Sequence, residues 1–508
     1  MYTSEQIEKM LAYGKKPFTR LLPRRVVPPK FSNSNLTNQP VNLPNIPCEI
    51  IDQSQFLQEL DPNSHRIMDC NVYPNKIVYR IDPDTEEETP DHIEEIARIP
   101  FAFQKVIKTK TVTHLTGKPL KWKLANEKPN KKQSDTFTWL KQKWLKKNMH
   151  VAFFEAVDIA YSCGDSALYF YRDNKKLNFS VWGYTKGDIL IPIYDSMGVM
   201  TQFIRYFSSL DEDGSSRRCV MIIDNKTVST YISGKKKSLK DWELVGNETN
   251  HGFANIPVCY KRTDVPHNDV QKLIEEFEWA FSSFCESNAY YAYPILFTTQ
   301  DVSQMPSKKS QGKVLTGVDQ NSKANFIEKQ GSDTSSKIQF EYLMKMIFMG
   351  SFSVQIDPDT LKSSGDMPSS TVRLIMTPEI DKAIERSKEW DLFIDNMYEL
   401  FADGIGKEFG KAVQINDLDI RLEIDIYTPE NSLELVNILN SSVASKTLSR
   451  QTAHELHPYG MNDEDDRYNK EVEEEKESEI DTNDSETKEV DTELNDTNLA
   501  RQLASQTK

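Results

Sequence analysis

The sequence has little of what marks disulfide-rich, zinc-binding or membrane proteins. Its 508 residues include six cysteines, and no two of them form a C-x-x-C pair. This spacing argues against a disulfide scaffold or a zinc ribbon and favours a reducing compartment. No apolar run approaches the roughly 18 residues of a membrane-spanning helix, and the N-terminus lacks the apolar segment of a signal peptide. We therefore expect a protein made in the cytoplasm, long enough for about two to four domains.

Signatures of catalysis and metal binding are also missing. The segment Gly312–Gly317 resembles a phosphate loop, but Val318 replaces the lysine that would reach the phosphates and Asp319 replaces the hydroxyl that would bind Mg²⁺. The eight histidines form no H-x-x-x-H pattern, and we interpret them as surface residues. Asp211–Gly214 suits a hairpin turn better than a calcium loop. The sequence therefore predicts a protein with no enzymatic activity, cofactor or metal.

Negative charge is concentrated at the C-terminus. The formal net charge is −15, yet Asp463 to Leu494 alone holds 16 acidic and 4 basic residues, so the rest of the chain is close to neutral. This tail is too charged and too poor in apolar residues to fold alone. It either repels DNA, recruits a scaffold protein or simply keeps the chain in solution.

Positive charge gathers in two stretches. Met1–Pro47 combines seven prolines with a run of basic residues, and the stretch from Lys105 to Lys147 holds 13 lysines against two acidic residues. Each stretch is either a solvated surface or a contact with the phosphates of a nucleic acid.

The order of predicted elements between Pro266 and Gly406 is the most informative feature. Apolar residues at a three-four spacing predict a first helix that is capped by Asn268 and ends before Pro294. The stripe consists of Val270, Leu273, Ile274, Phe277, Ala280, Phe281, Phe284 and Cys285. An excursion over Ile295–Asp333 follows, with short strands expected at Ile295–Thr299, Val314–Thr316 and Ala324–Ile327.

Two more helices follow this excursion. The first runs from about Ser335 to Gly350, and Gln355–Ser370, rich in serine, proline and glycine, is predicted to be a mobile loop. The second begins with the cap Thr377-Pro378, which breaks or kinks any earlier turn, and we expect Gly404 and Gly406 to end it.

The flanking regions mix helices and strands, which predicts the α+β class. Upstream we expect a helix over Asp91–Lys108 that is kinked or split at Pro100, an ambiguous Thr109–Leu115, and a helix over Phe137–Ala160. Strands are expected at Lys121–Leu124, Ala167–Tyr171, Leu177–Trp182, Ile189–Ile193, Thr201–Phe207, Arg218–Ile223, Thr227–Ile232 and Trp242–Val245. Downstream we expect a strand at Asp419–Ile426 and helices at Ser432–Ser441 and Ser449–Leu456.

This order resembles the portal proteins of tailed double-stranded DNA phages. Five stretches carry the resemblance: the helix before Thr116-Gly117-Lys118-Pro119, Cys163–Leu168 before a strand, Asp264–Tyr293 as first stem helix, Ser364–Ser370 before the long helix, and Val443–Thr452 leading into acidic Asp463–Glu477. The resemblance implies an α+β wing, a helical stem, a small β-containing clip, a long kinked helix and a helical crown.

The resemblance also implies a division of the chain. The proline-rich basic N-terminal extension would be residues 1–47, the wing 48–263, the first stem helix 264–293, the clip 294–333, the second stem helix 334–353, the channel loop 354–370, the long kinked helix and return strand 371–428, the crown 429–462, and the acidic, mostly disordered tail 463–508.

The implied function is that of a ring, usually of twelve subunits, at one vertex of a capsid, assembled in the host cytoplasm and carried in the virion. Double-stranded DNA would pass through it during packaging and ejection. Its partners would be the terminase large subunit, the major capsid protein, a scaffold protein and head-completion or adaptor proteins. Candidates to face DNA are Lys362, Ser363, Ser364 and Asp366, and candidates for motor docking are Lys308, Lys309, Lys313 and Lys323.

Two other functions are compatible with parts of the sequence. One is another phage head or neck protein, such as an adaptor or minor head protein, although these are usually much shorter. The other is a nucleic-acid enzyme, which would need a carboxylate or histidine cluster that the sequence does not display.

Overall fold

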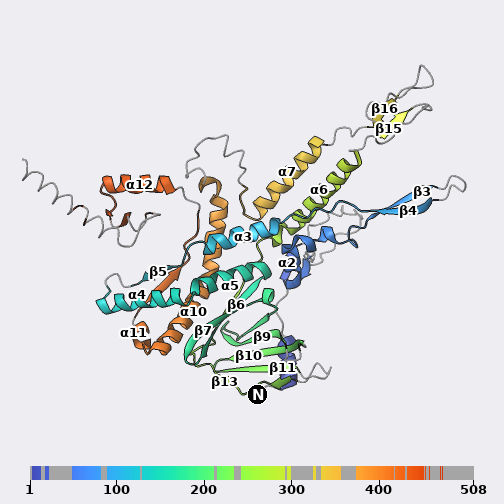
Figure 1. Cartoon of the computed structure of the whole chain (residues 1–508). Helices are drawn as coiled ribbons and strands as arrows, with labels where there is room; N and C mark the ends of the chain where they lie inside the picture. The colour runs from blue at the N-terminus through green and yellow to red at the C-terminus, as the bar shows by residue number, and fades with distance from the viewer. Residues whose placement is uncertain are drawn as a thin grey trace, which may run out of the picture. The chain divides into compact units, whose positions relative to one another are not determined.

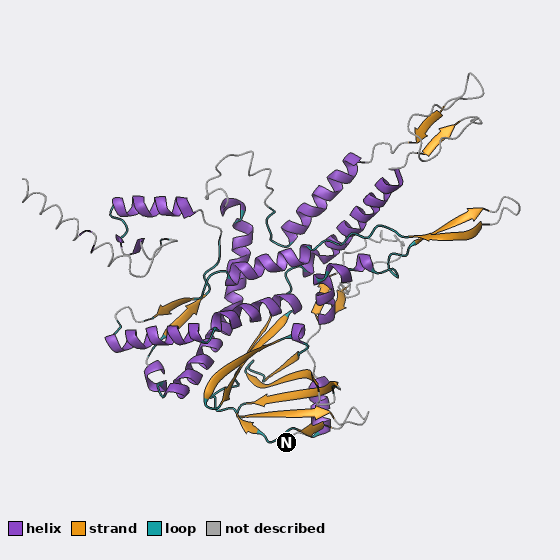
Figure 2. Cartoon of the chain, viewed as in Figure 1, coloured by secondary structure: helices purple, strands orange, loops and turns teal. Residues whose placement is uncertain are grey.

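We describe the protein from a computed structural model (Figure 1). The described residues are 3–12, 18–21, 48–81, 88–125, 129–210, 214, 216–233, 242–291, 295–298, 324–327, 333–355, 373–416, 418–428, 432–450, 452–453, 457, 470 and 472. The chain forms two compact units: Met1–Thr360 with Ile375–Tyr427, and Leu361–Leu374 with Thr428–Lys508. Helices and strands are interleaved throughout the larger unit (Figure 2), which confirms the predicted α+β class.

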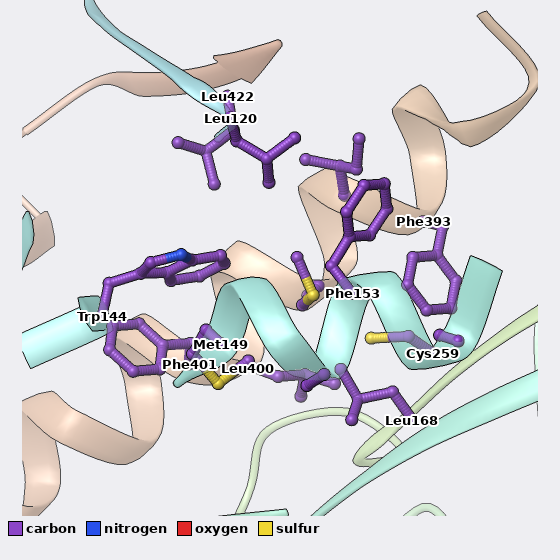
Figure 3. Packing of buried hydrophobic residues seen from close by; sticks show 14 of the residues in the cluster. Leu120, Trp144, Met149, Phe153, Leu168, Cys259, Phe393, Leu400, Phe401 and Leu422 are labelled. Atoms are coloured by element: carbon purple, nitrogen blue, oxygen red, sulfur yellow. The ribbon is translucent and has the colours of Figure 1, made fainter. Parts of the chain in front are cut away.

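Helix α5 (Met149–Cys163) is the centre of the larger unit. It packs against helices α3 (Phe103–Thr116), α4 (Lys131–Lys146) and α10 (Thr377–Phe409) and against a small sheet. Figure 3 shows Trp144, Phe153, Phe393 and Phe401 in this core, which is therefore assembled from segments far apart in the sequence.

The predicted helix over Phe137–Ala160 is wrong in one respect, because the structure divides it into α4 and α5. Asn148 adopts a left-handed conformation, with φ of 55°, between the two helices. Asparagine tolerates this region better than other non-glycine residues. The apolar periodicity continues across the break because both helices pack on the same core.

The small sheet has the order β14-β6-β7, with strands Val258–Arg262, Asp165–Asp173 and Lys176–Trp182. The strands predicted at Ala167–Tyr171 and Leu177–Trp182 are confirmed, and they pair as a hairpin. Asn174 and Lys175, with φ values of 49° and 67°, form its two-residue turn. Left-handed residues at both positions match the twist of the flanking strands.

A larger antiparallel sheet follows in the chain, in the order β12-β11-β10-β9-β8, and β13 also pairs with β11. Helix α1 (Ser4–Ala12) covers it by placing Ile7 among Ile191, Ile204, Val220, Ile222 and Tyr231. The strands are β8 (Ile189–Tyr194), β9 (Met200–Leu210), β10 (Ser216–Asp224), β11 (Thr227–Ser233), β12 (Trp242–Leu244) and β13 (Thr249–Asn250). The strands predicted here are confirmed.

The predicted helix over Asp91–Lys108 is wrong in its first half. Residues Glu88–Glu94 form strand β4, which pairs with β3 (Lys76–Ile81), and the helix α3 begins only at Phe103. Pro100 lacks an N–H and biases its neighbour toward extended geometry, so α3 cannot extend upstream. The ambiguous Thr109–Leu115 is helical. Upstream of β3 lie β1 (Phe18–Leu21), β2 (Cys48–Ile51), α2 (Gln53–Leu60) and the 3₁₀ turns Pro62–Ser64 and Arg66–Met68.

The predicted succession of helix, strands and helix is present. Helix α6 (Gln271–Tyr291) is followed by β15 (Ile295–Thr298), β16 (Ala324–Ile327) and helix α7 (Asp333–Gly350), and the two strands are antiparallel partners (Figure 1). The predicted Asn268 cap is wrong. A 3₁₀ turn over Asn268–Val270 precedes α6, and no side-chain hydrogen bond caps that turn. The predicted strand Val314–Thr316 lies outside the described residues.

The glycines expected to end the third helix lie inside α10, which runs on to Phe409. Gly410, with φ of 67°, is the residue that ends it. Gly404 and Gly406 are instead places of close packing. A Cβ at Gly404 would lie 2.5 Å from Leu177 Cδ1, and one at Gly406 would lie 3.0 Å from the Ala412 Cα.

We expect Gly404→Ala to destabilise the larger unit by about 1–3 kcal/mol, because the added methyl group overpacks the contact with Leu177. Denaturant unfolding of the variant measures this loss. Leu177→Ala in the same chain makes room for the methyl group, so the double variant should lose less than the two single changes together. Full additivity would show that Leu177 is not what forbids a side chain at this position.

Two short elements complete the larger unit. Helix α11 (Ala412–Asn416) follows α10, and β17 (Ile420–Glu423) pairs with β5 (Lys121–Leu124), almost 300 residues earlier in the chain. In the smaller unit, α12 (Ser432–Ala444) confirms the helix predicted from Ser432. Most of the helix predicted at Ser449–Leu456 and of the acidic tail lies outside the described residues.

Candidate functional site

Both groups of predicted site residues lie outside the described part of the chain. These are Lys308, Lys309, Lys313 and Lys323 in the excursion and Lys362, Ser363, Ser364 and Asp366 in the loop. The structure does describe the elements to which these segments are attached. They are the pair α6 and α7 with the strands between them, and the two ends of the loop at Val354 and at the start of α10.

An aromatic surface joins α6 to α7. Phe277 and Phe281 of α6 lie against Phe340 of α7, with ring centroids 5.9 and 5.4 Å apart. Phe101 and Phe103 contact the same Phe277 at 5.0 and 5.3 Å. Aromatic pairs of this kind contribute roughly 0.5–1.5 kcal/mol beyond the burial of their area. Phe101 also contacts Phe281, and Phe103 also contacts Phe348 of α7. The helix pair therefore rests on the start of α3 through a shared cluster of aromatic rings.

A buried polar group on α6 holds the chain just before α3. Glu278 Oε1 accepts a hydrogen bond of 2.8 Å from the Phe101 N–H and lies 2.7 Å from His65 Nδ1. The side chains of Glu278 and His65 are each 2% exposed. Burial lowers the pKa of His65, but the hydrogen bond and charge of Glu278 outweigh burial and leave that pKa raised. The ion pair between protonated His65 and Glu278 stabilises the fold fully below about pH 6.5. This stabilisation is lost as the pH rises through the raised pKa of His65.

Residues one and two turns later extend this polar stripe along α6. Ser282 Oγ accepts a hydrogen bond of 3.0 Å from the Ile99 N–H, and Glu286 forms an ion pair with Lys76 at the start of β3. Because residues four apart lie on one line of a helix, Glu278, Ser282 and Glu286 share one face. The segment that contains β3 and β4 is thus fastened to a side of α6 that lies about 100° around the helix from the aromatic stripe that α7 covers.

A second buried polar cluster fastens the start of the predicted loop. Val354, the last residue but one before the undescribed segment, donates its N–H to Glu379 Oε2 at 3.0 Å. Its carbonyl accepts a hydrogen bond of 2.5 Å from Lys110 Nζ, which also lies 3.5 Å from Glu379. Glu379 stands in the first turn of α10, so a single carboxylate joins the two described ends of the loop.

His114 extends this cluster to a third segment. Its Nε2 lies 3.0 Å from Glu379 Oε1, and its Nδ1 lies 2.7 Å from the carbonyl oxygen of Tyr427. The Tyr427 N–H in turn donates to the His114 carbonyl at 2.9 Å. Both ring nitrogens therefore face acceptors, which a protonated imidazole satisfies fully. We call Lys110, His114 and Glu379 the loop anchor.

The charges of the loop anchor support one another. Burial lowers the pKa of His114, but its hydrogen bonds to Glu379 and to the Tyr427 carbonyl outweigh burial and leave that pKa raised. Burial raises the pKa of Glu379, but the hydrogen bonds from His114 and Val354 and the charge of Lys110 leave it lowered. The cluster is thus held as a charged group inside the protein, where removing one partner leaves the others uncompensated.

Sequence reasoning missed both clusters. The interpretation of the histidines as surface residues is wrong for four of them, because His65, His114, His251 and His267 are buried. Single histidines carry no spacing pattern, and their carboxylate partners are more than two hundred residues away in the chain. One signal was available: Glu379 follows Thr377-Pro378, and an acidic residue in a first helical turn interacts favourably with the helix dipole.

The structure offers no metal centre or membrane span in the residues it describes. Within those ranges, no three histidine, cysteine, aspartate or glutamate side chains come together as metal ligands. In the same residues, none of the helices combines the length and the apolar character needed to cross a bilayer.

Comparisons with known proteins identify one family. Its sequence model, described as phage portal protein, SPP1 Gp6-like, matches residues 63–483. Among solved structures, the neck of an empty GTA particle computed with C6 symmetry is similar at 12% identity and a TM-score of 0.38, over 70% of this chain and 88% of that one. No curated protein matches. The family match covers the chain from β3 to α12 and the first part of the acidic tail.

Proposed function

The chain belongs to the SPP1 Gp6-like phage portal protein family, and from this membership we propose that its copies form a ring through which double-stranded DNA is packaged and ejected. The family is structural rather than enzymatic, and its role is that of a head-to-tail connector in a virion. The observation that carries the proposal is the family match over residues 63–483. The succession α6, β15, β16, α7 supports it, because it supplies two stem helices around a small β module.

Within this proposal each described element has a role. Residues 48–263 and the segment 371–428 with α10 and β17 form the wing and its long helix. Helices α6 and α7 form the stem, and residues 294–333, with β15 and β16, form the clip. Residues 354–370 form the channel loop, and residues 429–462, with α12, form the crown. Residues 1–47 and 463–508 are terminal extensions.

The charge distribution supports passage of DNA rather than tight binding. Each phosphate that a protein neutralises adds to affinity, and many such contacts would arrest a moving duplex. Outside its acidic tail the chain is close to neutral. We propose that Lys362, Ser363, Ser364 and Asp366 on the channel loop face DNA, where alternating charge and hydroxyl groups give weak contacts without sequence preference.

The loop anchor supports a positioned channel loop. Glu379 and Lys110 bind both the N–H and the carbonyl of Val354, so the loop starts from a fixed point, and Glu379 also belongs to the helix that follows the loop. A loop fixed at both ends samples fewer conformations than one fixed at a single end. We propose that this fixation sets how far the loop extends toward DNA.

The partners follow from the same proposal. Lys308, Lys309, Lys313 and Lys323 on the clip would present positive charge to the terminase large subunit during packaging, and head-completion or adaptor proteins would replace it afterwards. The major capsid protein and a scaffold protein would contact the ring during assembly in the host cytoplasm. Twelve copies are expected in the ring.

Electron microscopy of the purified full-length protein tests the proposal. We expect closed rings with a central channel wide enough for duplex DNA, and a single-particle mass measurement should give one dominant species near twelve copies. Binding of duplex DNA should be weak, independent of sequence and abolished by moderate salt. A protein that stays monomeric at all concentrations, or one that cleaves DNA, would contradict the proposal.

A further inference from the structure

The hairpin of β3 and β4, which we call the arm, presents an apolar pair to solvent. Ile77 and Ile93 are directly opposite each other in the register of the two strands, and they are 51% and 68% exposed. In the described part of the chain, no third strand pairs with the arm. A two-stranded hairpin is marginally stable by itself in water, and stable ones pack against a further element. The arm in Figure 1 therefore lacks the surface that would complete it.

Carboxylates surround this apolar pair. Asp91 and Glu95, two residues before and after Ile93, are exposed, and so is the neighbouring Glu94. The nearest described cation, Lys76, is bound to Glu286 of α6. The arm thus has an apolar centre with an acidic border.

Helix α7 carries a matching surface, which we call the α7 face. It consists of four exposed apolar side chains: Ile338 (47% exposed), Tyr342 (62%), Met346 (53%) and Met349 (77%). Their spacing of four, four and three residues places them on one stripe of the helix. Lys345 lies within this stripe, 5.8 Å from the Tyr342 ring, and Lys337 lies beside it. Glu341 is exposed and lies between the two lysines on the same line of the helix. The border of the α7 face therefore carries two cations and one anion, a positive balance that is complementary in charge to the arm.

The arm and the α7 face lie on different sides of α6. The apolar stripe of α6, with Phe277 and Phe281, is covered by the inner side of α7, so the α7 face points away from α6. The polar stripe of α6, with Glu278 and Glu286, holds the segment of the arm instead. The two surfaces of one chain therefore face apart, and the surface that fits each of them is found on a second copy.

We propose that the arm of one copy lies on the α7 face of the next copy, with Ile77 and Ile93 against Tyr342 and Met346 and with the acidic border of the arm beside Lys345. This contact joins two different surfaces, so after one contact the first copy keeps its α7 face, and the second keeps its arm, for a further neighbour. Repetition of such a contact closes into a ring when the rotation per copy divides a full turn. The inference rests on the ring proposed above and identifies surfaces that join its neighbours.

Disulfide trapping tests the contact in the full-length protein. Ile93→Cys with Tyr342→Cys should give, under mild oxidation, a ladder of covalent oligomers on a non-reducing gel. Ile93→Cys with Leu145→Cys is the matched control, since Leu145 is similarly exposed, at 52%, on α4. This control pair should give no ladder. Both variants are made in a background that lacks the exposed Cys70 and the half-buried Cys285, through Cys70→Ser and Cys285→Ser, and that also carries Cys48→Ser.

Charge reversal provides a second measurement. Lys345→Glu should raise the protein concentration needed for half-maximal ring assembly at least tenfold, and adding Glu95→Lys should recover most of that loss. Rings that form normally but give no ladder with Ile93→Cys and Tyr342→Cys would overturn the arm contact and leave the ring intact. A wild-type protein that forms no ring would overturn the ring and this contact together.

Discussion

Replacing Glu379 with alanine is expected to release Val354, at the start of the proposed channel loop, and to cost about 3–5 kcal/mol of local stability. The change removes the acceptor of the Val354 N–H and leaves the buried His114 and the half-buried Lys110 beside no anion, which is the costly way to break an ion pair inside a protein. Hydrogen exchange of the Val354 amide reports the opening directly. A loss of about 3 kcal/mol makes that exchange roughly a hundredfold faster. Unchanged exchange would mean that Glu379 does not hold the loop.

A control variant and a pH series separate this effect from general damage to α10. Glu385→Ala removes an exposed carboxylate on the same helix, paired only with Lys382, and should leave the Val354 exchange unchanged. The lowered pKa of Glu379 makes its contribution present above about pH 4.5 and lost as the pH falls through the folded value.

The raised pKa of His114 has the opposite consequence. Its contribution is complete below pH 6.5 and is lost as the pH rises through the folded value. After correction for intrinsic exchange, protection of Val354 should therefore be greatest between about pH 4.5 and 6.5 and decline on both sides. In Glu379→Gln both declines should flatten, because neither charge then has its partner.

Phe277→Ala is the second change with a large expected effect, about 3–5 kcal/mol in the helix pair. The ring of Phe277 is 3% exposed and contacts Phe101, Phe103, Phe281 and Phe340. Alanine leaves a cavity among aromatic rings that cannot collapse into it without losing their own contacts. Hydrogen exchange should become faster throughout α6 and α7 and stay unchanged in the β8 to β13 sheet.

Trp279→Ala is the matched control on the same helix. Trp279 is larger than Phe277 and only two residues away, but it is 45% exposed and lies off the aromatic stripe. We expect a change in exchange below threefold within α6 and α7. Equal effects of the two variants would show that the loss follows the size of the removed side chain and not its burial between the helices.

The order of elements was predictable from the sequence wherever local signals were strong. The stripe from Val270 to Phe284 and the apolar, β-branched segments before Leu244 gave the correct element types, because both kinds of segment bury side chains in a core. The errors occurred where a distant partner decided the conformation. Glu88–Glu94 became a strand because β3 supplies its hydrogen bonds. Gly404 is a glycine because Leu177 occupies the space of a side chain, and not because the helix ends there.

The candidate site was predictable only as a pair of segments. Composition marked the excursion and the loop, through lysine, serine, proline and glycine, and the site residues predicted within them lie outside the described residues. The loop anchor was beyond sequence reasoning, because Lys110 and His114 meet Glu379 across more than 260 positions and no spacing rule connects them. The arm was missed for the same reason. Part of β4 was predicted to be helical, and no element was predicted at β3.

The position of His114 has a mechanical consequence. The chain leaves the larger unit after Val354, returns to it before Glu379 and leaves it again after Tyr427, and all three crossings meet at one imidazole and one carboxylate. The three crossings are therefore linked, because each of them contacts His114 or Glu379, and these two side chains contact each other. Displacing the chain at Tyr427 therefore disturbs the His114 and Glu379 contacts that also hold Val354.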